Sequence, residues 1–316
     1  MTARRVGIVA CGLVTAAACG AGSPVAPKPV PDAPTLSCPA SIAAESLDGA
    51  AVTLAFVPPT AAGGQPPVSV TCTAQSGSAF PIGSTTVSCT ATDSFSRQAS
   101  CTFNVAVSIV PRISKTRFLA FGDSITYGRC DAAPKKCDEY TVRIGELLRV
   151  QYPRQSFVVT PRGVPGEEPV DGQLRLPVEL TTYNPEVLLL MEGTNSVNDP
   201  ASTHLVPLAA LEEMVSRAQS RGVIVFLATI PPARAPGYTQ RALAIPGFNA
   251  QVRLMAARRG AILVDIFAAM NADVTRYVGA DDLHPSEEGM RLIGETFYAA
   301  IRQALDVTPI PSGRHQ

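Results

Sequence analysis

The sequence has 316 residues, with no tryptophan, three histidines and 16% charged residues. Without tryptophan, the chain has no indole platform on which a sugar could stack. Lys plus Arg and Asp plus Glu both number 26, so the formal net charge is zero. This balance argues against nucleic acid as a partner, because nucleic-acid binders carry a basic patch or stripe. Hydrophobic residues make up 46%, which is enough for a sizeable core, and the length suggests about two domains.

The N-terminus lacks an apolar run long enough to span a bilayer, which takes about 20 residues. Residues 1–18 instead place Arg4 and Arg5 before a short apolar run that ends in alanines. This order is typical of a signal peptide that is removed on export. Cys19 follows directly, so the junction resembles a bacterial lipobox in which Ala16 replaces the usual leucine. We expect an exported protein anchored to a bacterial membrane by a lipid on Cys19, with a secreted or periplasmic protein as the alternative.

Two further segments have few large apolar side chains. Residues 19–35 are rich in proline, which predicts a semi-rigid tether between the lipid and the first domain. Residues 307–316 end in Pro-Ser-Gly-Arg-His-Gln and are expected to form a flexible tail.

Residues 36–110 alternate apolar and polar side chains, as in Val52, Leu54 and Phe56, with Gly-rich and Pro-rich turns between. Alternation at a period of two is typical of half-buried strands. About seven short strands in this segment predict an all-β, antiparallel sandwich of the immunoglobulin type.

The four cysteines of this segment are expected to be oxidised in an exported protein. They allow three pairings, of which we favour Cys38–Cys101 and Cys72–Cys89. The first would tie the first strand to the last, and the second would close the middle. Each bridge should stabilise this small core by roughly 2–4 kcal/mol.

The segment also resembles a known extracellular domain. Residues 76–93, closed by Cys101-Thr-Phe103, are similar to the hyalin repeat (HYR) domain. That resemblance implies an immunoglobulin-like fold with a spacer or adhesive role, in contact with a surface or polymer, and it implies no catalysis.

The second half of the chain alternates strands and helices. Apolar runs predict strands at 117–121, 156–160, 185–191, 222–230 and 261–267, and helical spacing predicts helices at 139–152, 207–220, 241–259 and 286–304. Continuous apolar strands between amphipathic helices predict a parallel sheet covered on both faces. In such sheets the chemistry lies at the carboxyl ends of the strands.

Ser124 follows the first of these strands, in the turn Gly122-Asp123-Ser124, where a serine is placed as an exposed nucleophile. Taken alone, the tripeptide fits a turn that caps a helix better than it fits a nucleophile. A serine nucleophile needs a base, and His284 stands before the last helix with Asp281 three residues ahead of it. That spacing lets the carboxylate accept the Nδ1 proton and leaves Nε2 free as the base. Asp282 is the alternative partner.

The other two histidines fit the role of a base less well. His204 lies in the loop after the third strand, without a carboxylate three residues ahead, and His315 lies in the tail. Donors for an oxyanion are expected at the ends of the second and third strands. Gly163 begins a Gly-x-x-Gly turn, and Asn195 ends the segment Glu192-Gly-Thr-Asn195.

Together these motifs resemble the SGNH (GDSL-type) hydrolase family over about residues 116–306. The resemblance implies a flavodoxin-like three-layer α/β/α fold that uses no metal and no cofactor. It implies Ser124 as nucleophile, His284 as general base and Asp281 as the residue that orients it. The oxyanion hole would be formed by the backbone N–H groups of Ser124 and Gly163 and the side-chain amide of Asn195. One position departs from the family. The family's second sequence block often reads Asn-x-Gly-x-x-Gly, and in the corresponding residues 161–166 Pro161 stands in place of the Asn.

Cys130 and Cys137 bracket a short polar loop after the nucleophile turn. In an exported protein we expect a disulfide between them, with two free thiols as the alternative.

The hypothesis from sequence is therefore an exported serine esterase that hydrolyses carboxylic esters, with acetyl groups on glycans as a candidate substrate. One rival is a lysophospholipase or thioesterase that acts on lipid acyl esters. The other is a cell-surface adhesin that uses the hydrolase fold only to bind. The loops 196–205 and 231–246 are expected to shape the acyl and alcohol pockets.

Overall fold

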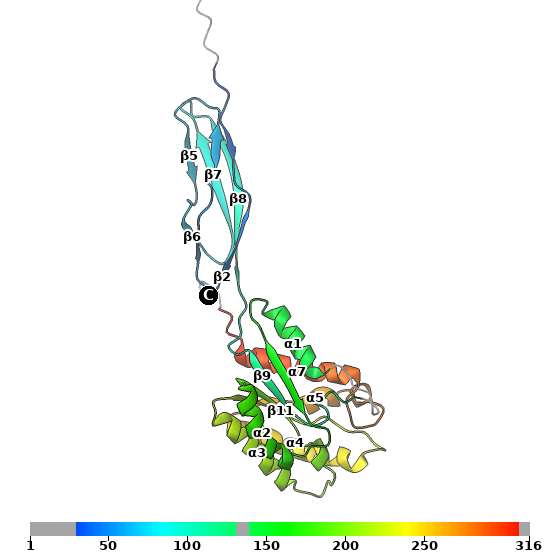
Figure 1. Ribbon diagram of the computed structural model, residues 1–316. Coiled ribbons are helices and arrows are strands. Elements are labelled where there is room, and N and C mark those ends of the chain that lie inside the picture. The colour runs from blue at the N-terminus through cyan, green and yellow to red at the C-terminus, as the bar shows by residue number, and fades with distance from the viewer. Residues whose placement is uncertain (1–29, 131–138, 310–316) are drawn as a thin grey trace, which may run out of the picture. The chain divides into compact units, whose positions relative to one another are not determined.

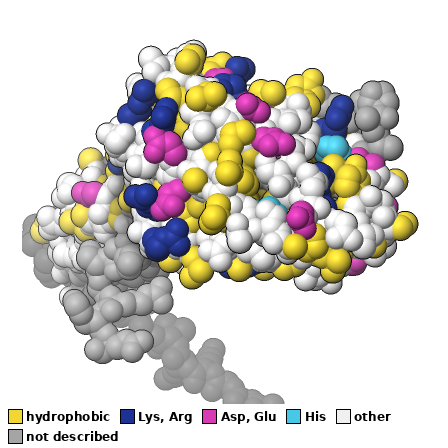
Figure 2. All heavy atoms as spheres, turned by 90° about the horizontal axis from the view of Figure 1, so that it is seen from below, with side chains coloured by type: hydrophobic (Ala, Val, Ile, Leu, Met, Phe, Trp, Pro, Cys, Tyr) yellow, Lys and Arg dark blue, Asp and Glu magenta, His cyan; other side chains and the backbone are white. Residues whose placement is uncertain are grey.

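The structure of the protein is a computed structural model that describes residues 30–130 and 139–309. It contains an N-terminal β-rich region and a C-terminal α/β domain (Figure 1). Among the described residues, no helix is both long enough and apolar enough to cross a membrane. On the face drawn in Figure 2, Lys and Arg side chains lie among Asp and Glu side chains rather than in a basic stripe.

The β-rich region has a main sheet of four strands in the order β2-β8-β7-β5, and two smaller pairs, β1 with β4 and β3 with β6. The strands are β1 Thr35–Ser37, β2 Ile42–Ser46, β3 Val52–Leu54, β4 Thr60–Ala62, β5 Ser69–Cys72, β6 Ser78–Phe80, β7 Gly83–Thr92 and β8 Gln98–Ile109. The expectation of a wholly antiparallel sandwich was wrong in one place, because β2 runs parallel to β8. These two strands are far apart in sequence, so no hairpin forces them to run in opposite directions.

The core of this region follows the alternation seen in the sequence. Inward-facing residues of β7 and β8 are buried, among them Val87, Ala91, Phe103 and Val105. Both predicted disulfides, Cys38–Cys101 and Cys72–Cys89, are present. They join β8 to the chain just after β1, and β5 to β7.

The α/β domain is built on a five-stranded parallel sheet in the order β10-β9-β11-β12-β13. The strands are β9 Arg117–Gly122, β10 Val158–Gly163, β11 Val187–Met191, β12 Ile224–Ala228 and β13 Ile262–Val264. In order of appearance in the chain this is 2-1-3-4-5, the doubly wound order of flavodoxin-like folds. All five residues of β11 are buried, as expected of a central strand with helices on both faces.

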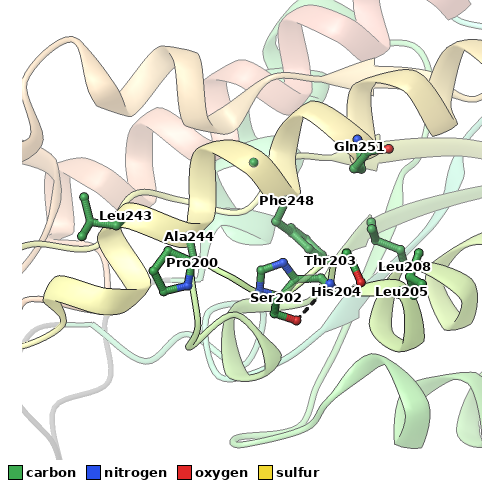
Figure 3. Close-up of a pocket in the computed structure, with 11 residues that line it drawn as sticks. Pro200, Ser202, Thr203, His204, Leu205, Leu208, Leu243, Ala244, Phe248 and Gln251 are labelled. Atoms are coloured by element: carbon green, nitrogen blue, oxygen red, sulfur yellow. Dashed lines mark hydrogen bonds between the residues drawn. The ribbon is translucent and has the colours of Figure 1, made fainter.

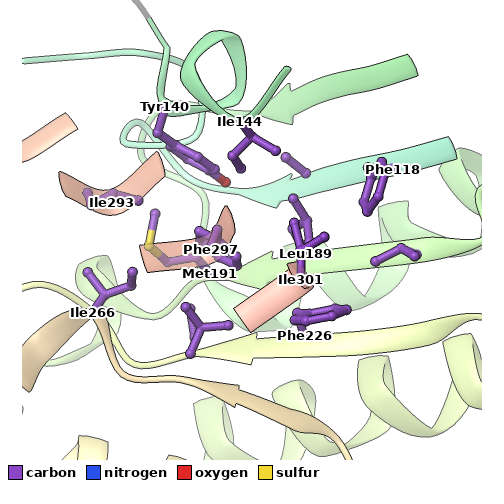
Figure 4. Packing of buried hydrophobic residues seen from close by; sticks show 14 of the residues in the cluster. Phe118, Tyr140, Ile144, Leu189, Met191, Phe226, Ile266, Ile293, Phe297 and Ile301 are labelled. Carbon is purple, nitrogen blue, oxygen red and sulfur yellow. The ribbon is translucent and has the colours of Figure 1, made fainter. Parts of the chain in front are cut away.

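Helices cover both faces of this sheet. Residues of α1 Tyr140–Gln151, α5 Ile266–Asn271 and α7 Glu287–Leu305 form one core with Phe118, Leu189 and Phe226 (Figure 4). Residues of α2 Pro169–Tyr183, α3 Leu205–Gln219 and α4 Thr239–Arg259 form the other core on the opposite face. The short helix α6 Val274–Tyr277 and the 3-10 turn Thr194–Ser196 complete the domain.

Three details differ from the expected elements. Helix α2 was not predicted, because Pro177 lies inside it and Leu174 and Val178 point to solvent, which obscures the helical period. The strand expected at 261–267 is shorter, because the Asp265 side chain accepts a hydrogen bond from the Ala268 N–H and so begins α5. The start of the expected tail is held in place, since the Val307 N–H donates to the Arg112 carbonyl at 2.9 Å.

Candidate active site

The predicted site residues come together at the carboxyl edge of the parallel sheet. Ser124 follows β9, Gly163 ends β10 and Asn195 follows β11. His284 arrives from the loop before α7. Strand β9 pairs with β10 on one side and β11 on the other, so the direction of winding reverses beside it. In open α/β sheets this reversal opens a crevice where ligands bind.

The turn that carries Ser124 depends on a glycine and an aspartate. A methyl group on Gly122 would lie 2.0 Å from the Met191 carbonyl oxygen, so only glycine fits between β9 and β11 here. The Asp123 carboxylate accepts a hydrogen bond from the Ile125 N–H at 2.9 Å, and its backbone carbonyl accepts one from Tyr127 at 3.0 Å. Ser124 is therefore held on a tight, buried turn.

Ser124, His284 and Asp281 form a continuous hydrogen-bonded chain. Ser124 Oγ lies 2.9 Å from His284 Nε2, and His284 Nδ1 lies 2.6 Å from Asp281 Oδ2. The other Asp281 oxygen accepts from the backbone N–H groups of Leu283 and His284, at 3.0 and 2.8 Å. The carboxylate is thus fixed by its own loop, and it fixes the plane of the imidazole.

The neighbouring Asp282 points elsewhere. Its backbone is left-handed, with φ of 65°, and its carboxylate pairs with Arg234 at 3.0 Å. The structure therefore brings Asp281, rather than the alternative Asp282, to the histidine ring.

Gly163 packs directly against the nucleophile turn. A methyl group on Gly163 would lie 2.1 Å from the Tyr127 backbone nitrogen and 2.5 Å from the Asp123 carbonyl oxygen. Pro161, the departure from the family pattern, lies in β10 opposite Ala120. β10 is an edge strand, where a residue without an N–H is tolerated. The glycine is thus beside Ser124 even though the usual Asn is absent.

Asn195 links the segment that follows β11 to the turn that follows β10. Its Nδ2 donates to the Glu167 carbonyl oxygen at 2.8 Å, in the turn that follows Gly163. Gly193, two residues earlier, has a φ of +130°, and a methyl group there would meet the Phe248 ring at 2.7 Å. This backbone conformation, open mainly to glycine, sets the direction of the segment that carries Asn195.

His204 does not join the chain formed by Ser124. Its ring lies edge-on to Phe248, with centroids 5.9 Å apart, beside a cavity of about 400 Å³ between α3 and α4 (Figure 3). Leucine side chains from both helices line this cavity together with Ser202 and Gln251. No described residue is a hydrogen-bond partner for His204 Nε2.

A cluster of buried carboxylates behind the site was missed by the sequence analysis. Glu192 and Asp123 are each 1% exposed, and Glu167 is buried beside them. Arg175 holds Glu167 with two hydrogen bonds of 2.8 and 2.5 Å and lies over the Phe121 ring. Burial, followed by the nearby Glu167 and Asp123 charges, raises the Glu192 pKa to about 9. Burial likewise raises the Asp123 pKa to about 6, against the Ile125 N–H, which favours the carboxylate.

Glu192→Gln should therefore raise the melting temperature at pH 7 to 8 and flatten its decline with pH. The pKa of this carboxyl is higher in the folded than in the unfolded protein, so it costs the folded protein no stability below its unfolded pKa of about 4.3. As the pH rises from there towards 9, the folded protein loses stability relative to the unfolded protein. Glutamine has nearly the same shape and cannot ionise, so it removes this loss. Thermal unfolding between pH 5 and pH 9 measures the effect.

Glu186→Gln is the matched control with the opposite sign. Burial acts against ionisation there too, but the Thr116 and Arg117 N–H groups lower the pKa of Glu186. That variant should lose stability at neutral pH. If Glu192→Gln also destabilises the protein at pH 8, the Glu192 carboxyl is ionised in the folded state and the assignment of a neutral acid is wrong.

Cys130 is buried and disulfide-bonded. Cys137, its predicted partner, lies outside the described residues, as do Cys19 and the segment that precedes it. The predicted lipidation and the Cys130–Cys137 pairing therefore stay predictions.

A parallel sheet with a buried serine and histidine and a partly exposed aspartate in contact at its carboxyl edge defines a hydrolase-type α/β domain. The sequence model of the GDSL-like lipase/acylhydrolase family matches residues 120–292, which is more than half of the chain. The chain therefore belongs to this family and is an ester-hydrolysing enzyme of the SGNH type. The HYR domain matches residues 31–107. No curated protein matches the chain.

Solved structures share the fold of the α/β domain. A lipase/acylhydrolase from Enterococcus faecalis is 24% identical with a TM-score of 0.54, covering 60% of this chain and 97% of that one. The acetylxylan esterase Axe2 from Geobacillus stearothermophilus is 21% identical with a TM-score of 0.50, covering 60% and 95%. The α/β hydrolase LAE5 from the metagenome of Lake Arreo is also 21% identical at 0.50, covering 60% and 96%.

Proposed function

We propose that the protein is a serine esterase that cleaves carboxylic esters by two-step acyl transfer. The observation that carries the proposal is the hydrogen-bonded chain from Ser124 Oγ through His284 to Asp281, with spacings of 2.9 and 2.6 Å. Such a chain can remove a proton from a weakly acidic hydroxyl at neutral pH, because the carboxylate stabilises the imidazolium that forms. A domain that only binds, as in the adhesin hypothesis, has no need of this arrangement.

In the first step Ser124 Oγ attacks the ester carbonyl carbon, and His284 Nε2 takes the hydroxyl proton. His284 then gives that proton to the alkoxide oxygen as the carbon–oxygen bond of the ester breaks, which leaves an acyl group on Ser124. In the second step His284 takes a proton from water, which attacks the acyl carbon. The acid leaves, and the proton returns to Ser124.

The negative oxygen of each tetrahedral intermediate needs donors aimed at it. We assign this role to the backbone N–H groups of Ser124 and Gly163 and to the side-chain amide of Asn195. The contact between Gly163 and the nucleophile turn supports the two backbone donors, because it holds the backbone of Gly163 next to the turn that carries Ser124. The Glu167 carbonyl supports the Asn195 side chain as the third donor, because it accepts a hydrogen bond from one N–H of the amide and so fixes the plane of the amide.

The acyl group can be a short one such as acetyl, or a lipid chain. Axe2, which shares the fold, is an acetylxylan esterase, and this supports acetyl groups on glycans as the first substrate to test. The cavity beside His204 has leucine side chains in its lining and offers a place for a longer chain.

An acyl-length series of p-nitrophenyl esters, from acetyl to palmitoyl, tests the function and separates these substrates. The proposal predicts hydrolysis that is fastest with acetyl and falls with chain length. A rate that rises towards the long chains would replace the acetyl esterase by the lipid acyl hydrolase. No hydrolysis of any member would contradict the esterase assignment.

We further propose that the protein is exported and anchored by a lipid on Cys19, with the HYR domain as a spacer that contacts a surface or polymer. The proposal rests on the sequence of residues 1–35 and on the match to the HYR domain. Cys19→Ser should abolish fatty-acid labelling and move the protein from the membrane fraction to the soluble fraction. Unchanged partition into the membrane would contradict it.

A further inference from the structure

A smaller cavity lies on the Gly163 side of the nucleophile turn. It has a volume of about 260 Å³ and is lined by Tyr127, Glu139, Pro161, Arg162, Gly163 and Val164. Tyr127 belongs to the turn that begins at Gly122, and Gly163 is in contact with the same turn. The cavity therefore shares a wall with the segment that carries Ser124.

We propose that this cavity receives the alcohol part of the ester, and that this alcohol is a hydroxylated ring such as a sugar. The proposal rests on the esterase function proposed above. Once the carbonyl carbon of an ester is at Ser124 Oγ, the acyl and alkoxy groups extend in different directions from it. The larger cavity beside His204 is lined by α3 and α4, so each of the two groups has a cavity of its own.

The apolar part of the lining suits the flat face of a ring. Tyr127 is 45% exposed and Val164 is 39% exposed, so both present contact surface rather than core. Pro161 adds a pyrrolidine ring at the position where the family usually has an amide. Sugars bury their C–H faces against such rings, and a tyrosine presents an apolar face with a polar tip. Tyr127 thus provides an aromatic surface at this cavity.

The polar part of the lining distinguishes a sugar from an alkyl chain. Glu139 places a carboxylate there, half-buried and bonded to the Thr141 hydroxyl at 3.3 Å. An alkyl chain would remove water from this carboxylate and return no hydrogen bond, which is costly. Ring hydroxyls donate hydrogen bonds, so they suit a carboxylate, which only accepts them.

The size of the cavity suits one ring. Its volume of about 260 Å³ is just below the range of about 300–1,000 Å³ that holds drug-sized ligands. A single sugar ring that carries the scissile ester fits this description better than a long lipid alcohol.

The test compares two acetate esters that differ only in the alcohol: an acetylated methyl xyloside and ethyl acetate. The measured quantity is the ratio of kcat/KM for the first over the second, in the full-length protein. Glu139→Gln and Tyr127→Ala should each lower this ratio about tenfold, mainly through the KM for the xyloside, because one charge-assisted hydrogen bond or one ring contact is lost. Glu146→Gln, an exposed glutamate on α1 outside the cavity, is the matched control and should keep the wild-type ratio.

Two results would overturn the subsite. In one, the wild type shows no preference for the xyloside ester. In the other, Glu139→Gln leaves the ratio unchanged, which decides the matter even if Tyr127→Ala does not fold. Failure of the proposed function is different and separately visible, since the wild type would then hydrolyse neither ester nor react with an organofluorophosphonate.

Discussion

Ser124→Ala and His284→Ala should each lower kcat for p-nitrophenyl acetate by about 10⁴-fold or more, and the double variant should be little worse than either. The two atoms that react, Ser124 Oγ and His284 Nε2, lie 2.9 Å apart, so each works only with the other. Groups that act as one catalytic unit are not additive, because removal of the first already ends the function of the second. Initial rates of the three variants, with folding checked by circular dichroism, measure this.

His204→Ala is the control, because it removes a buried histidine that is not the proposed base. His204 is buried against Phe248 and has no bond to Ser124, so its loss should lower the melting temperature and leave the base of Ser124 in place. Because His204 lines the larger cavity, any effect on the acyl group should appear in KM, and kcat for p-nitrophenyl acetate should stay near the wild-type value. If His204→Ala is inactive and His284→Ala is active, the base comes from the loop after β11 instead. Additive losses in the double variant would show that Ser124 and His284 do not form one unit.

Asn195→Ala should lower kcat by about 10²–10³, or about 3–4 kcal/mol, with little change in KM. The amide is assigned to the oxyanion, which exists only in the transition state and the tetrahedral intermediate. The ground-state ester therefore loses little on truncation. The bond from Asn195 to the Glu167 carbonyl, at 2.8 Å, holds the amide in place before substrate binds.

Asn271→Ala, an exposed asparagine at the end of α5, is the matched control and should leave both constants unchanged. A rise in KM at constant kcat for Asn195→Ala would assign the amide to substrate binding rather than to the oxyanion.

The elements that the sequence predicts best are those with an unambiguous local pattern. The run at 185–191 contains β11, and the Asp-x-x-His spacing brings Asp281 to His284. The spacing favoured Asp281 and kept Asp282 as the alternative. The structure shows why Asp282 does not reach the ring: its backbone is left-handed and its carboxylate pairs with Arg234. Local spacing cannot report either of these.

Features that depend on distant residues were not predictable. The buried carboxyl groups of Asp123, Glu167 and Glu192 come from the turns after three different strands, and Arg175, which pairs with Glu167, comes from α2. Each residue alone looks like an ordinary surface charge in the sequence. The parallel pairing of β2 with β8 depends on how the chain crosses the sheet, which alternation does not reveal. Helix α2 was obscured by Pro177, although the buried Leu176 and Leu180 sit one turn apart on its inner face.

The central claim is that Ser124 is a nucleophile activated by His284, and covalent labelling tests it most directly. The protein is treated with an organofluorophosphonate at pH 7.5, and the modified residue is located by peptide mass mapping. The account predicts one adduct, on Ser124, that forms far more slowly in His284→Ala and not at all in Ser124→Ala. An adduct on another residue, or equal rates of labelling in the wild type and His284→Ala, would contradict it.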